Sequence, residues 1–130
     1  MTYRDVLDAA VRLLSEDGEN GYTEDYTARA PYVLATFDAE CAAADRAYRQ
    51  SHGQEPLSAS GKTCVELHES FRLSDVFFPA ALYYLSAMLV MDENEALGER
   101  FFDLYSDAVS KILSALPATL SQIVDSYHLI

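Results

Sequence analysis

The stretch 76–91, VFFPAALYYLSAMLVM, contains no charged residue, although 23% of the chain is charged. A membrane-spanning helix needs roughly 20 apolar residues, so this stretch is too short to be a comfortable span. Its length suits a helix that is buried on nearly all sides. Asp92 and Glu93 end the stretch, and a second helical pattern follows at once. We therefore expect a helical hairpin whose first arm is the centre of an all-helical domain.

Three further segments repeat apolar residues at the spacing of an α-helix: 3–16, 23–49 and 93–115. The second of them contains Pro31, which removes a backbone donor inside the helix. We expect a kink there rather than two separate helices, because the apolar stripe keeps its phase on both sides. Pro117 ends the third segment.

The N-terminal helix has a recognisable start. Thr2 is a good N-cap residue, and Asp5 follows three positions later. In a capping box the cap hydroxyl and the later side chain each satisfy a free backbone N–H of the first turn, usually with Glu or Gln at the later position. The pair predicts a variant of this box.

The chain has 130 residues, half of them hydrophobic, which is enough for one domain with a single core. We predict an all-α fold, a small bundle of about four helices. The bundle domain covers 1–116, with a central loop insertion at 52–73, and 117–130 forms an extended C-terminal arm. We recognise no signal peptide, and we expect the protein to be made and kept in the cytosol at first.

The central insertion contains a stretch, 63–71, in which apolar and polar side chains alternate. The alternation predicts a short strand, or half of a small hairpin. An isolated strand pair is marginal in water, so the strand would lie on the helices or pair with another chain. The C-terminal arm would dock on its own domain or on a neighbour. Candidate oligomer contacts are therefore the apolar residues of both segments: Val65, Leu67, Phe71, Ile123, Val124 and Tyr127.

The charge of the chain is strongly negative, with 21 acidic residues against nine Lys and Arg and a net charge of −12. Proteins that bind nucleic acids hold the phosphates with basic patches, and this sequence has none. We therefore expect no specific binding of DNA. An acidic protein can still work beside DNA, by repelling it or by imitating it, or its charge can serve solubility alone.

Four carboxylates follow one another at every fourth residue of the last helix: Glu95, Glu99, Asp103 and Asp107. We call them the acidic ridge. Like charges at this spacing repel by a few tenths of a kcal/mol per pair. The ridge is either the ordinary solvated back of an amphipathic helix or an acidic wall that faces DNA or a basic partner.

Side chains that could carry chemistry are scattered. Cys64, Glu66 and His68 are able to bind a metal, but a structural zinc site needs four ligands and no second cluster matches them. The serines lack a nucleophile elbow, and the five glycines form no phosphate-binding loop. We expect no enzyme activity, no metal and no cofactor.

The order of parts resembles a known family. The long second helix begins with YTARAPY at 26–32, and a loop leads into FPAALYYLSAML at 78–89. The acidic break MDEN at 91–94 then precedes ALGERFFDLY at 96–105. This pattern is similar to the head–tail connector proteins, also called adaptor or head-completion proteins, of tailed bacteriophages and prophages of Gram-positive bacteria. The similarity covers about 3–116.

The resemblance implies a small helical bundle that assembles as a ring beneath the portal, with DNA passing through the ring. The implied partners are the portal protein, tail or stopper proteins and further copies of the chain, and the implied location is the virion, after assembly in the host cytoplasm. The family has no catalytic residues to transfer. An acidic ridge lining the channel would not trap DNA. The alternative function is a small acidic interaction protein, or DNA mimic, that binds a basic site on a host protein.

Overall fold

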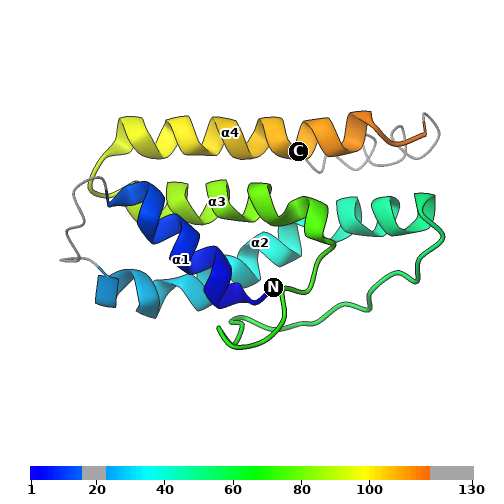
Figure 1. Ribbon diagram of the computed structural model, residues 1–130, viewed down its shortest axis with the longest axis horizontal. Coiled ribbons are helices and arrows are strands. Elements are labelled where there is room, and N and C mark those ends of the chain that lie inside the picture. Colours follow the sequence, from blue (N-terminus) through cyan, green and yellow to red (C-terminus); the bar gives the residue numbers. More distant parts are fainter. Residues whose placement is uncertain (16–22, 118–130) are drawn as a thin grey trace.

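Four α-helices form most of the part of the chain that the computed structural model describes, residues 1–15 and 23–117 (Figure 1). The prediction of a small all-α bundle is confirmed. A 3-10 turn, η1, directly precedes the third helix. The elements in chain order are α1 (Tyr3–Leu14), α2 (Thr23–Ser51), η1 (Asp75–Phe77), α3 (Phe78–Val90) and α4 (Glu95–Ser114).

Helix α3 is the centre of the bundle, as its uncharged sequence predicts. It packs against α1, α2 and α4, and Figure 1 shows it between α4 on one side and α1 and α2 on the other. The ring of Tyr84 on α3 lies 5.7 Å from the ring of Phe37 on α2 and 5.0 Å from the ring of Tyr105 on α4, measured between centroids. Aromatic side chains thus join three helices. Within the described residues, no helix is long and apolar enough to cross a membrane.

The starts of two helices are fixed by side-chain caps. The predicted box at α1 is present: the Asp5 backbone N–H donates to Thr2 Oγ1 at 3.3 Å, and the Thr2 N–H donates to Asp5 Oδ2 at 2.8 Å. At α4, Asn94 Oδ1 accepts from the Leu97 N–H at 3.1 Å.

Helix α2 continues through Pro31 without a break, so the proline does not split it.

The strand predicted at 63–71 is wrong. The segment forms turns, and its one β-type pairing in the described chain is an isolated bridge between Thr2 and Ser70. Its carbonyls instead accept from the first turn of α1: the Tyr3 N–H donates to Glu69 O and the Arg4 N–H to Leu67 O. The first N–H groups of a helix have no partner within that helix, so the segment satisfies them instead of forming a ladder.

A buried carboxylate ties the end of the central segment to α2. Asp45 is 1% exposed. Its Oδ1 accepts from the Ser74 N–H at 2.9 Å, directly before η1, and its Oδ2 pairs with Arg49 Nε at 2.8 Å. Arg49 Nη2 donates in turn to Arg72 O. These bonds hold the chain in place where it enters α3.

We predict that Asp45→Ala destabilises the protein by about 3–5 kcal/mol, because it leaves the Arg49 guanidinium and the Ser74 N–H without their buried acceptor. The loss is measured by urea unfolding followed by circular dichroism. Asp25→Ala is the matched control, since Asp25 pairs with Arg29 at the same spacing but with 57% of its side chain exposed. The control should lose at most about 1 kcal/mol. Equal losses in the two variants would contradict the role of burial.

Candidate functional site

The acidic ridge lies on the outer face of α4. Its four carboxylate residues, 95, 99, 103 and 107, are all exposed. The opposite face of the helix is buried through Phe101, Tyr105, Val109 and Ile112. Figure 1 shows that α4 forms one edge of the bundle.

Two large apolar side chains flank the ridge. Phe102 is 39% exposed and Leu104 is 37% exposed. The apolar spacing of 93–115 would place Leu104 on the inner face, and this expectation is wrong: Leu104 is exposed, while Phe101, Tyr105, Val109 and Ile112 form the buried face. The outer face of α4 therefore combines carboxylates with accessible apolar surface, which is suited to contact with a partner.

The candidate oligomer contacts of the central segment point inward. Val65 and Phe71 are buried in the core, and Leu67 is partly buried against it. The side chains of the expected strand thus face the interior as the alternation predicts, although no strand forms. In this conformation they offer a partner little surface. Ile123, Val124 and Tyr127 lie outside the described residues.

The metal-capable side chains of the same segment are on the surface. His68 Nδ1 lies 3.7 Å from Glu66 Oε2, both side chains are exposed, and Cys64 is exposed as well. In the described ranges 1–15 and 23–117, no group of three or more His, Cys, Asp or Glu residues is arranged to hold a metal ion.

A groove with both polar and apolar walls runs between α2 and the part of the central segment at 58–73. It consists of two adjoining cavities of about 290 and 270 Å³. The α2 wall carries Asp38, and the segment contributes polar and charged side chains. The residues that line both cavities are Ala35, Asp38, Ser60, Lys62 and Arg72.

Asp38 is buried at the base of this groove, with 8% of its surface exposed. Its Oδ2 accepts from the Tyr3 hydroxyl at 2.5 Å, and that hydroxyl accepts from the Arg72 N–H at 3.3 Å. Within the described part of the chain, Oδ1 has no hydrogen-bond partner. Burial raises the pKa of Asp38 to about 6, although the Tyr3 bond and the charge of Arg72 act in the other direction. Burial, together with Asp38, also raises the pKa of Tyr3, so its hydroxyl stays protonated.

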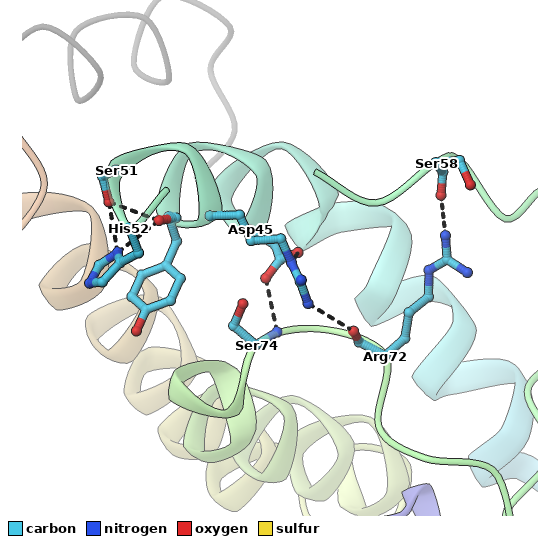
Figure 2. A network of polar contacts seen from close by, with 8 residues as sticks. Asp45, Ser51, His52, Ser58, Arg72 and Ser74 are labelled. Atoms are coloured by element: carbon cyan, nitrogen blue, oxygen red, sulfur yellow. Dashed lines mark hydrogen bonds and ion pairs between the residues drawn. The ribbon is translucent and has the colours of Figure 1, made fainter. Parts of the chain in front are cut away.

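Polar contacts fasten the two limbs of the central segment to each other and to α2 (Figure 2). Arg72 reaches across from one limb and donates to the carbonyl oxygen of Ser58 on the other. Lys62 Nζ lies 3.6 Å from Glu69 Oε2. The Asp45–Ser74 bond fastens the segment to α2, and the other two contacts join parts of the segment to each other.

Sequence patterns did not single out Asp38 or Asp45 as functional candidates. A signal was nevertheless present, because both acids fall within the apolar stripe of α2, beside Phe37 and Ala44. A carboxylate at a core position must find hydrogen-bond or ion-pair partners, so such a position predicts a polar network. One partner of Asp45 is local, because Arg49 follows four residues later on the same helix. The other partners, Tyr3 for Asp38 and Ser74 for Asp45, lie 35 and 29 residues away, and no local pattern identifies them.

Comparison with known proteins adds no relative. No family model matches the chain, and neither a curated protein nor a solved structure is significantly similar to it.

Asp38 predicts a specific pH dependence of stability. Its pKa of about 6 in the folded protein exceeds the ordinary value near 4, so the fold favours the protonated acid. The stabilisation is complete below about pH 4 and is lost as pH rises through 6, an effect of about 3 kcal/mol. Asp38→Asn keeps an acceptor for Tyr3 and removes the titration.

The measurement is the difference in unfolding free energy between Asp38→Asn and the wild type, taken from pH 4 to pH 7. Subtraction removes the contributions of the other acids that titrate in this range. We expect the difference to grow in favour of the variant as pH rises. A difference that is flat with pH would contradict the raised pKa.

Proposed function

We propose that this protein is a structural protein of a tailed bacteriophage: a head–tail connector or adaptor that forms an oligomeric ring at the portal, through which DNA passes. Its partners would be the portal protein, tail or stopper proteins and further copies of the chain. It would assemble in the host cytoplasm and remain in the virion. Its role would be structural rather than catalytic.

The exposed ridge on α4 is the observation that carries the proposal. Repulsion between its carboxylates brings no benefit to the isolated fold, and their exposure leaves them free to meet a partner or to repel DNA. A net charge of −12 would also keep a ring of such subunits from trapping DNA phosphates. The small helical bundle agrees with the fold that the sequence resemblance implies.

The same ridge supports a second candidate, a small acidic interaction protein or DNA mimic that occupies a basic site on a host protein. The carboxylates span about 18 Å along α4, at a rise of 1.5 Å per residue. A rigid row of this length could replace a stretch of phosphates. In that case, a single host protein with a basic site would be captured, and neutralising the ridge would abolish the capture.

Co-expression with the portal protein of the same genome tests the connector proposal. We expect the two proteins to co-purify, and electron microscopy to show an added ring on the portal. Mass spectrometry of particles purified from the same phage should detect the chain. Its absence from those particles, together with a portal that does not retain it, would contradict the proposal. A monomer in solution would not, because an adaptor can assemble only on its target.

A further inference from the structure

Basic side chains gather at the groove between α2 and the 58–73 part of the central segment. Arg46, Lys62 and Arg72 line its second cavity, in a chain that has only nine Lys and Arg in total. The acids in the same wall are withdrawn from the surface: Asp38 and Asp45 are buried and bonded to Tyr3, Arg49 and Ser74. The accessible charge of this second cavity is therefore positive, whereas the first cavity also carries the partly exposed Glu69, which pairs with Lys62.

These cations are available to a partner. Among the described residues, neither Arg46 nor Arg72 has a carboxylate within ion-pair distance. Arg46 is exposed, and 56% of the Lys62 side chain is exposed despite its contact with Glu69. The rim also carries accessible apolar surface from Ala39, Ala42 and the partly buried Leu57.

The acidic ridge has the complementary composition. It offers carboxylates flanked by exposed Phe102 and Leu104. Figure 1 shows α4 at one edge of the molecule and the central segment at the opposite edge. Two surfaces on opposite edges cannot both be satisfied within one two-fold pair. They can be satisfied when each copy binds the next head to tail, and repetition of that contact generates a closed ring or an open filament.

We propose that the groove lined by Arg46, Lys62 and Arg72 receives the acidic ridge of a second copy of this chain. The proposal deepens the connector function and rests on it for its role, because it identifies the surfaces that would join neighbours in the ring. The carboxylates of Glu99 and Asp103, at the middle of the ridge, pair with Arg46 and Lys62. A cavity of about 270 Å³ admits such side chains but not a whole helix, so α4 lies across the mouth of the groove.

Charge reversal at each surface tests the contact. The groove variant is Arg46→Glu with Lys62→Glu, and the ridge variant is Glu99→Lys with Asp103→Lys. All four residues are exposed, so the bundle should tolerate the changes, and circular dichroism confirms folding. The wild type should self-associate in sedimentation equilibrium at about 0.15 M salt, where a Debye length of about 8 Å screens the long-range repulsion between copies of net charge −12. Association should weaken at about 1 M salt, where the paired charges of the contact are screened as well. Each variant alone should lose about tenfold or more in association constant, because like charges then face each other.

An equimolar mixture of the two variants should regain association. The reversed groove of one then meets the reversed ridge of the other, while their two unchanged surfaces make the wild-type contact. Arg4→Glu with Arg12→Glu is the control for the groove variant, because it lowers the net charge by the same four units. Both side chains are exposed on α1 and line neither cavity of the groove. The control should associate no more than twofold more weakly than the wild type, about 0.4 kcal/mol by the relation between affinity and free energy.

Two results would overturn the interface. One is a wild-type protein that stays monomeric at about 1 mM and about 0.15 M salt, where even a head-to-tail contact with a Kd of about 1 mM would be roughly 40% occupied. The other is a mixture of variants that fails to associate although both are folded. If the portal captures the wild type and both variants equally, the result supports the connector function and contradicts this interface. If the mixture recovers association but the portal captures none of the proteins, the result supports the interface and contradicts the connector function.

Discussion

The absence of any charged side chain from α3 is the constraint on which this fold depends. A helix without a polar face has to be covered on all sides, and α1, α2 and α4 supply that cover. Helices α1 and α4 are amphipathic and direct their polar faces outward. The outer face of α4 is therefore a consequence of covering α3, and its carboxylates stand on a rigid element rather than on a loop. Because these carboxylates are held on a rigid helix, less conformational entropy is lost when a partner binds them.

A second constraint comes from the two acids that lie within the bundle. Asp38 and Asp45 sit on the inner side of α2, where a carboxylate is costly unless it is bonded. The bonds come from the N-terminus and the central segment, through Tyr3 and Ser74. Polar contacts thus help to hold the central segment on the bundle, beside the buried Val65 and Phe71. Truncation of Val65 or Phe71 would leave a cavity in the core. Loss of Asp45 would instead leave the charge of Arg49 without its partner.

Much of this fold could be predicted from the sequence because its signals are local. The uncharged run at 76–91 and the box formed by Thr2 and Asp5 depend only on neighbouring residues, and both are confirmed. The strand at 63–71 was wrong because alternating polarity is also produced by an irregular segment that lies along a protein surface. The free N–H groups of α1 decided its backbone pairing. The groove could not be predicted, since it joins residues of α2 to a segment whose path depends on the whole bundle.

The buried acids also bear on why cations gather in the groove. A carboxylate in the core stabilises nearby positive charge, and this accounts for Arg49, which pairs with Asp45, and in part for Arg72, which bonds to Ser58 and acts on Asp38. It does not account for Arg46, which is exposed and forms no ion pair with another described residue. Within the described residues, no ion pair of the bundle uses the charge of Arg46. If the cations of the groove only balanced its own buried acids, Arg46 would have no role there. The proposed contact with the acids of a second copy gives it one.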